Sequence, residues 1–142
     1  MAIQQTTTTS FKVELLQAVH NFGPTGADTF KIALYTANAV LGPDTTAYTT
    51  VEEISGGGYV AGGEVLLNVS VNLGNGVAYA SFDNPSWPAS SFTTRGALIY
   101  NFTKSNKSIG VLNFGSDQTT LNQAFQIQLP TNNPETALIR IL

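Results

Sequence analysis

The chain has 142 residues, of which 42% are hydrophobic and 11% charged, and 6 Lys+Arg against 9 Asp+Glu give a formal net charge of -3. This length fits one domain with its own core, and the acidic balance leaves no source for the phosphate neutralisation that nucleic-acid binding needs. There is no cysteine, which excludes disulfides, thiolate metal ligands and cysteine nucleophiles. The polar residues are mostly Thr, Asn, Ser and Gln, a surface suited to large contacts with other proteins.

Residues 1–9 form a polar tract without basic residues or an apolar run, so they predict neither a signal peptide nor a membrane span. We expect a flexible arm here, which either frays or becomes ordered against a neighbouring subunit. Ser10 is a suitable N-cap, and apolar residues recur at helical spacing from Phe11 to Phe22, before a Gly-Pro pair. The sequence therefore predicts a helix over 10–22 at the start of a single domain, 10–142.

Alternating apolar residues over 30–36 predict a strand that buries one face, and the Gly-, Pro-, Asp- and Thr-rich segment 38–50 predicts a long surface loop. Residues 64–73 and 77–82 alternate cleanly around Gly74-Asn75-Gly76, which predicts a β-hairpin. Further strands are expected at 92–102, 109–114, 125–129 and 137–142, with a turn at 115–117. About seven strands and one helix predict a mainly β fold, an antiparallel β-sandwich or jelly-roll-like domain with one N-terminal α-helix.

Two residues in the strand region have more than one interpretation. Trp87 lies between Pro85 and Pro88 and is either a core anchor at a sheet corner or an exposed aromatic side chain that contacts a partner or a sugar. Arg95 enters a long apolar run, so we expect it at an exposed strand end or paired with a carboxylate.

No catalytic, cofactor-binding or metal-binding residue is predicted. His20 is the only histidine, and we expect it to complement the dipole at the end of the predicted helix. There is no GxSxG nucleophile motif, and the glycines of 55–63 have neither the spacing nor the following Lys-Ser/Thr of a phosphate-binding loop. The loop aspartates are isolated and typical of turns. The sequence thus favours a protein that is not an enzyme.

A succession of short sequence words resembles a family of small virion structural proteins of tailed bacteriophages. The words follow the same order over nearly the whole chain: Ser10-Phe11-Lys12, Glu14-Leu15-Leu16, His20-Asn21-Phe22, Phe30 to Thr36, Thr46 to Thr49, Gly58-Tyr59, Ala61-Gly62-Gly63 and Thr94 to Asn101. The resemblance implies a non-enzymatic structural role. Size and β character match best the capsid decoration, or cement, class, whose members sit as trimers on the outside of the major capsid shell.

The resemblance implies synthesis in the bacterial host cytoplasm, a place on the capsid surface, and the major capsid protein and copies of the chain itself as partners. The acidic charge balance and the polar N-terminal tract predict no nucleic acid and no membrane as partners. Alternatives are a tail, head-fibre or baseplate component, and a carbohydrate-binding module with Trp87, Tyr59 and Tyr100 as stacking platforms. We expect the arm and the 38–50 loop to reach neighbouring subunits. The candidate partner contacts are Thr7, Thr8, Thr9, Pro43, Asp44, Tyr48 and Trp87.

Overall fold

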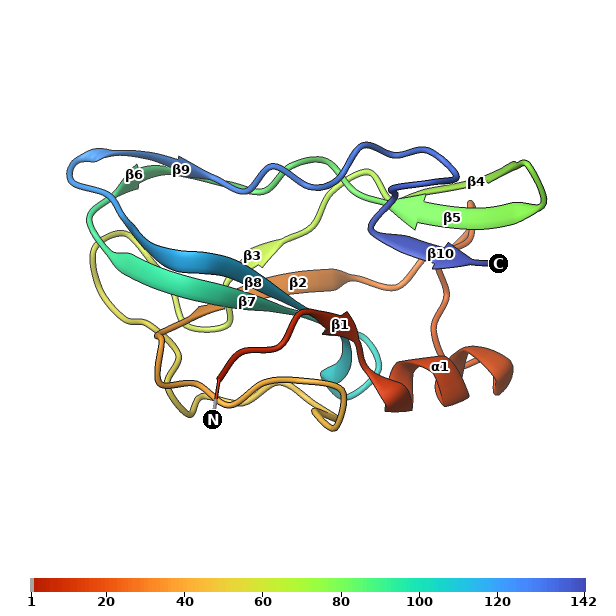
Figure 1. Cartoon of the computed structure of the whole chain (residues 1–142), viewed down its shortest axis with the longest axis horizontal. Helices are drawn as coiled ribbons and strands as arrows, with labels where there is room; N and C mark the ends of the chain where they lie inside the picture. The colour runs from red at the N-terminus through yellow and green to blue at the C-terminus, as the bar shows by residue number, and fades with distance from the viewer. Residues whose placement is uncertain (1) are drawn as a thin grey trace.

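A computed structural model describes residues 2–142 (Figure 1). The elements in chain order are β1 (Thr6–Thr7), α1 (Thr9–Leu16), β2 (Phe30–Tyr35), β3 (Glu64–Val65), β4 (Ser70–Gly74), β5 (Val77–Ser81), β6 (Ser86–Ser90), β7 (Thr93–Asn101), β8 (Lys107–Thr119), β9 (Gln123–Gln126) and β10 (Ile139–Ile141). Strands make up 43% of the chain and helix 6%, which confirms the mainly β prediction.

The strands form three antiparallel sheets. The large sheet has the order β1-β8-β7-β2-β3, and the small ones have the orders β10-β5-β4 and β6-β9. At the centre of the large sheet, β2 and β7 pair without interruption from Phe30 opposite Asn101 to Tyr35 opposite Gly96. Both small sheets lie along one side of the large sheet, as the upper layer of Figure 1. The result is the expected β-sandwich.

The large sheet is covered on both faces. Between the layers lies the main core, which includes Phe30, Ile32, Leu34 and Trp87. On the opposite face, Tyr35 and Leu98 pack in a second cluster with residues of two irregular segments, 2–8 and 36–53, which we call the loop cover. The prediction that the 30–36 strand buries one face is therefore wrong, because in β2 only Lys31 is not fully buried.

The predicted helix 10–22 is too long. The helix begins after its N-cap Thr8 and ends at Leu16, and Ala18 then has a φ of 59°, in the left-handed region. The chain turns back here, so that Phe22 packs edge-on against Phe11 with ring centroids 6.1 Å apart. The apolar residues after Leu16 therefore reach the core because the chain folds back, and not because the helix continues. His20 lies beyond the helix rather than at its end.

The expected flexible arm is ordered against its own chain in the part that the structure describes, residues 2–9. Ile3 is 4% exposed and pairs with Leu41 in an isolated bridge, while Thr6 and Thr7 pair with β8. Gly96 makes room for the arm, since a Cβ at this position would lie 2.7 Å from the Ile3 side chain. Burial of the Ile3 side chain and the pairing with β8 together hold the segment in place.

The predicted hairpin is confirmed: Asn75 and Gly76 have φ angles of 51° and 75°, as a type I′ turn requires. The predicted 64–73 strand is interrupted at Asn68, which has a φ of 56°. The predicted turn at 115–117 lies inside β8, as an irregularity in its register with β7. At this irregularity Arg95 Nη1 lies 3.3 Å from Asp117 Oδ1, so the arginine is paired and near the surface, as expected.

Candidate functional site

The structure brings together two of the predicted contact regions, the N-terminal segment and the 38–50 loop. Thr7 is half-buried in β1, Thr8 is fully buried and Thr9 is exposed at the start of α1. The Thr9 N–H donates to the carbonyl of Pro43 at 2.9 Å. Ser108 Oγ lies 2.9 Å from Thr8 Oγ1, so the Thr8 side chain is engaged within its own chain and is not available to a partner.

These two segments enclose a shallow hollow of about 450 Å³. Ala2 and Gln4 lie on one side, and the loop from Val40 to Thr46 lies on the other. Val40 is 61% exposed, and Asp44 is exposed while Pro43 is half-buried. Of the predicted contact residues, Pro43 and Asp44 therefore line one accessible surface of the loop cover, and Thr9 lies beside Pro43 at the start of α1.

Trp87 is 1% exposed and packs among Tyr59, Phe92 and Phe125. This confirms its interpretation as a core anchor. The interpretation of Trp87, Tyr59 and Tyr100 as sugar-stacking platforms is wrong, because the two tyrosines are also buried, at 7% and 1%. The rings lie inside the layers of the sandwich, where their apolar area stabilises the fold.

Glu53 holds the end of the loop cover through the hydroxyl groups of two tyrosines. Its carboxylate accepts hydrogen bonds from the Tyr48 hydroxyl at 2.7 Å, from the Tyr59 hydroxyl and from the Gly62 N–H at 2.8 Å. Tyr100 donates to the Gly62 carbonyl at 2.6 Å. Burial, together with the Glu53 charge, raises the pKa of Tyr100 to about 12. Tyr48 also stacks on Tyr100, so this predicted contact residue is mainly a clamp on the loop.

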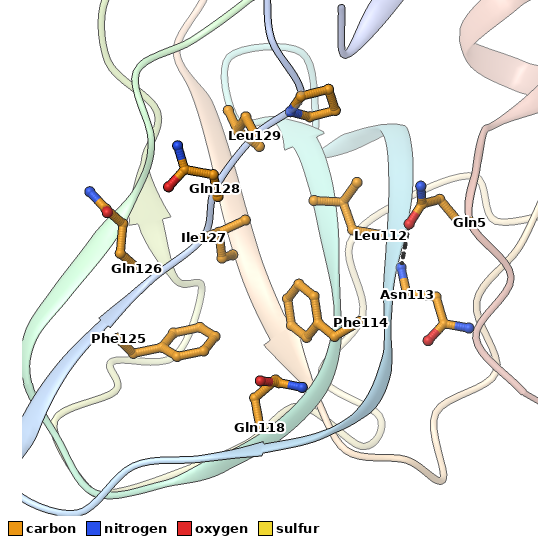
Figure 2. A pocket seen from close by; sticks show the side chains of 11 residues that line it. Gln5, Leu112, Asn113, Phe114, Gln118, Phe125, Gln126, Ile127, Gln128 and Leu129 are labelled. Atoms are coloured by element: carbon orange, nitrogen blue, oxygen red, sulfur yellow. Dashed lines mark hydrogen bonds between the residues drawn. The ribbon is translucent and has the colours of Figure 1, made fainter. Parts of the chain in front are cut away.

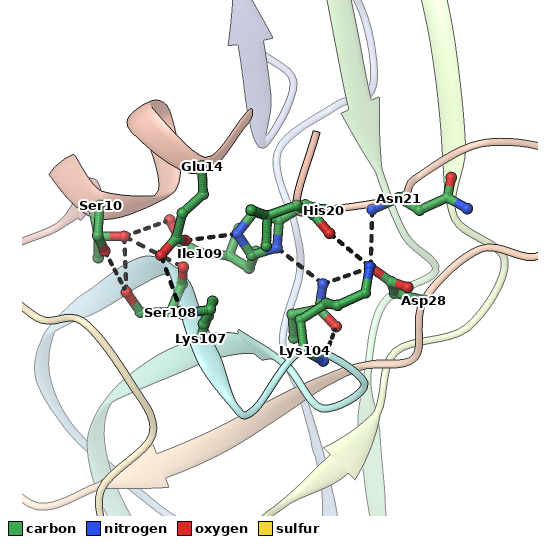
Figure 3. A network of polar contacts seen from close by, with 12 residues as sticks. Ser10, Glu14, His20, Asn21, Asp28, Lys104, Lys107, Ser108 and Ile109 are labelled. Carbon is green, nitrogen blue, oxygen red and sulfur yellow. Dashed lines mark hydrogen bonds and ion pairs between the residues drawn. The ribbon is translucent and has the colours of Figure 1, made fainter. Parts of the chain in front are cut away.

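A second polar network surrounds His20, whose two ring nitrogens are both engaged (Figure 3). Nε2 lies 2.8 Å from Glu14 Oε1, and Nδ1 lies 2.9 Å from Asn101 Nδ2. The same Asn101 nitrogen donates to Asp28 Oδ2 at 2.8 Å. Because an amide nitrogen only donates, Nδ1 is the acceptor and the Nε2–H donates to Glu14.

Asp28 completes this network. Burial would raise the pKa of its carboxyl group, but the hydrogen bonds from Asn101 and the Asn21 N–H, with the Lys104 ammonium, outweigh burial and hold the pKa below its usual value. Within residues 2–142, no serine or threonine hydroxyl bonds to His20, so the arrangement lacks the nucleophile of a catalytic triad. What the network does is tie the segment after α1 to the ends of β7 and β8.

Large apolar side chains gather on a surface that we call the apolar end, formed by α1, the β4–β5 hairpin and β10. Leu16, Leu73 and Leu142 are 92%, 79% and 88% exposed. Register places Leu73 and Ile141 on the same face of the small sheet, each opposite Ala78. Contiguous exposed apolar area of this kind marks surfaces that other proteins cover. This surface is not apparent from the sequence, because alternation predicts a two-faced strand without telling what covers each face.

Charge is distributed unevenly between this surface and the loop cover. Lys12 and Arg140 line a groove of about 380 Å³ at the apolar end, and no acidic side chain lines it. Between Lys31 and Arg95 the sequence has no basic residue, and Asp44 and Glu52 of the loop cover are exposed. One surface therefore presents cations beside apolar groups, and the other presents anions.

Within residues 2–142, no three Asp, Glu or His side chains gather in a way that could hold a metal ion. The one helix that the structure describes is too short to cross a membrane. Comparisons with protein-family models, with curated proteins and with solved structures each gave no match.

Proposed function

We propose that this chain is a structural protein of a tailed-bacteriophage virion, without enzymatic activity, and that it is a capsid decoration (cement) protein. It binds the outer surface of the major capsid shell and stabilises that shell. The apolar end carries the proposal: three leucines exposed by more than three quarters are costly on a free surface and useful in an assembly.

The resemblance to phage virion proteins supports the proposal because of where the matching segments lie in the fold. Phe30 to Thr36 contains β2, and Thr94 to Asn101 contains all of β7 except its first residue, so both strands of the central pair are included. The words at Thr46 to Thr49, Gly58-Tyr59 and Ala61 to Gly63 lie in or beside the segment clamped by Glu53. The resemblance thus falls on the framework of the fold, which is the part that proteins sharing an architecture have in common.

A homotrimer is supported by the complementary charge of two surfaces. The cations Lys12 and Arg140 flank exposed leucine side chains at the apolar end, while Asp44 and Glu52 accompany the exposed Val40 and Val51 on the loop cover. A contact between two different surfaces of neighbouring copies closes into a ring when the rotation is right. We therefore expect the apolar end of one copy to pack against the loop cover of the next copy. The resulting trimer would bind the capsid surface.

The first experiment is the copy number of the chain relative to the major capsid protein in purified virions, by quantitative mass spectrometry. A ratio near one to one supports the decoration protein. A ratio of a few per cent would instead support the alternative, a tail, head-fibre or baseplate component.

The second experiment tests the surface itself. Leu16→Ser combined with Leu73→Ser should convert trimers to monomers in mass photometry and reduce binding to stripped capsids. Leu121→Ser is the matched control, because Leu121 is 74% exposed but lies in the β8–β9 connection and is expected to leave assembly unchanged. A double variant that still forms trimers and binds capsids would refute the role of the apolar end.

A further inference from the structure

Strands β8 and β9 follow one another in the chain but belong to different sheets, so they diverge. A trench lies in the space between the two strands, which we call the fork (Figure 2). Its walls are Leu112 to Phe114 with Gln118 on one side and Phe125 to Pro130 on the other, and its volume is about 360 Å³. A second hollow of about 350 Å³ shares Gln5, Leu112 and Pro130 with it. The two hollows are therefore neighbours along one seam of the sandwich.

The trench is neutral and rich in primary amides. None of the residues that line it is charged, and five of them are Gln5, Asn113, Gln118, Gln126 and Gln128. The floor contains two half-buried aromatic rings, Phe114 and Phe125, with centroids 6.1 Å apart and nearly perpendicular planes. A cleft with apolar walls and a few polar groups is the usual form of a small-molecule site, and this one selects an uncharged ligand.

Four backbone N–H groups of the trench walls already have hydrogen-bond partners. On β8, the Asn113 N–H donates to Gln5 Oε1 at 3.0 Å and the Gly115 N–H donates to Asn113 Oδ1 at 2.8 Å. On the other wall, the Ile127 and Leu129 N–H groups donate to Pro85 and Asn84. An added peptide strand needs unpaired backbone groups at a sheet edge, so these contacts disfavour a polypeptide in the trench.

The side-chain amides, in contrast, have unused capacity. Among residues 2–142, the amide groups of Gln126 and Gln128 make no hydrogen bond, and both side chains are exposed. Gln118 uses its Nε2 on Ser116. Each amide offers an acceptor oxygen and two N–H donors side by side, which matches adjacent hydroxyl groups that donate and accept in turn.

The aromatic floor favours the same class of ligand. Phe125 packs against Trp87, Phe92 and Phe114, whereas in residues 2–142 Phe114 has Phe125 as its one aromatic neighbour. The Phe114 ring points into the fork (Figure 2). An aromatic face beside hydroxyl-binding amides fits a sugar ring, which has an apolar C–H face and a polar edge.

We propose that this trench binds a neutral oligosaccharide, with Gln126 and Gln128 hydrogen-bonded to its hydroxyl groups and Phe114 packed on the apolar face of one sugar ring. The site differs from the excluded Trp87 platform, because its residues reach the surface. The inference does not rest on the proposed capsid function, and a virion surface is one place where such a site would act.

The test is binding of the intact protein to an array of neutral oligosaccharides, followed by isothermal titration with the strongest ligand found. Gln126→Ala combined with Gln128→Ala should lower the affinity for that ligand at least tenfold. The matched control is Gln123→Ala, which is exposed on the same strand but lies outside the trench and should bind as the parent does. Both glutamines are exposed and unbonded, so the double variant should fold, which circular dichroism verifies.

Three outcomes would overturn the proposal. One is the absence of binding to every neutral glycan on the array. The second is equal affinity in the parent and the double variant, which would place the sugar elsewhere. The third is protection of the trench amides by an extended peptide and not by a sugar, which would assign the trench to a polypeptide. None of these results alters the copy number in virions, so failure here is distinguishable from failure of the proposed capsid role.

Discussion

The two faces of the large sheet are covered in different ways. Between the layers, strands of the small sheets cover it, and the contact is made by apolar and aromatic side chains such as Phe30 and Trp87. On the other face, irregular backbone covers it, and the hydroxyl groups of Tyr35, Tyr48 and Tyr100 donate hydrogen bonds to the Thr49 carbonyl, the Glu53 carboxylate and the Gly62 carbonyl. A strand satisfies its backbone by pairing, whereas a loop over a core needs side-chain partners for its buried N–H and C=O groups. Apolar volume therefore stabilises one face, and specific polar contacts stabilise the other.

The largest expected effect is on the strand-covered face. Trp87→Ala should lower the free energy of unfolding by about 4–5 kcal/mol, because it removes the largest fully buried side chain and leaves a cavity. Urea denaturation measures the loss. Trp87→Phe is the control and should cost much less, since Trp87 Nε1 is buried without a hydrogen-bond partner and its removal relieves that penalty.

Next comes Gly63→Ala, at the close approach of the segment after the loop cover to β2. Gly63 has a φ of 83°, and an added Cβ would lie 1.8 Å from the Ile32 carbonyl oxygen. Forcing the backbones apart should cost about 3–4 kcal/mol. Gly56→Ala is the matched control: its φ is 74° but the space around it is open, so about 1–2 kcal/mol is expected. Equal losses in thermal denaturation would show that backbone strain alone matters.

A smaller loss is expected for Glu53→Ala, which leaves the Tyr48 and Tyr59 hydroxyls and the Gly62 N–H without their acceptor. We expect a loss of about 2–3 kcal/mol, with faster hydrogen exchange confined to the loop cover. Glu52→Ala is the neighbouring control, since Glu52 is exposed and bonds to Thr36, and it should change stability by less than about 1 kcal/mol. Exchange that rises equally in the strand-covered face would contradict the separation of the two faces.

The last effect is absent at neutral pH and appears only at high pH. Burial and the nearby Glu53 carboxylate raise the pKa of Tyr35, Tyr48, Tyr59 and Tyr100 in the folded state, that of Tyr100 to about 12. The unfolded tyrosines lose their protons near pH 10, so stability should fall between about pH 10 and 12, where the unfolded state binds fewer protons. Denaturation midpoints across this range measure the slope. Tyr100→Phe should make the dependence of stability on pH less steep. An unchanged slope would show that Tyr100 does not contribute to it.

The sequence by itself determined the mainly β fold and the hairpin, because alternation and turn residues act locally. The Asn75-Gly76 turn is the clearest case, since its conformation follows from two residues. The tryptophan between two prolines was ambiguous from sequence, and its burial depends on the sheet formed by β6 and β9. The functional proposal rests partly on sequence resemblance and partly on a surface that local patterns did not predict.

Only the tertiary structure decided where the polar N-terminal segment lies, where the helix ends and which apolar faces remain exposed. Ile3 is buried because Gly96, far along the chain, leaves room for it. His20 and Glu14 meet because the chain turns back after Leu16, so that both reach β7 and β8. Leu73 and Ile141 share an exposed face, and Gln126 and Gln128 line a trench, because of how three sheets stack. Contacts between residues distant in sequence set these features, and no local pattern encodes them.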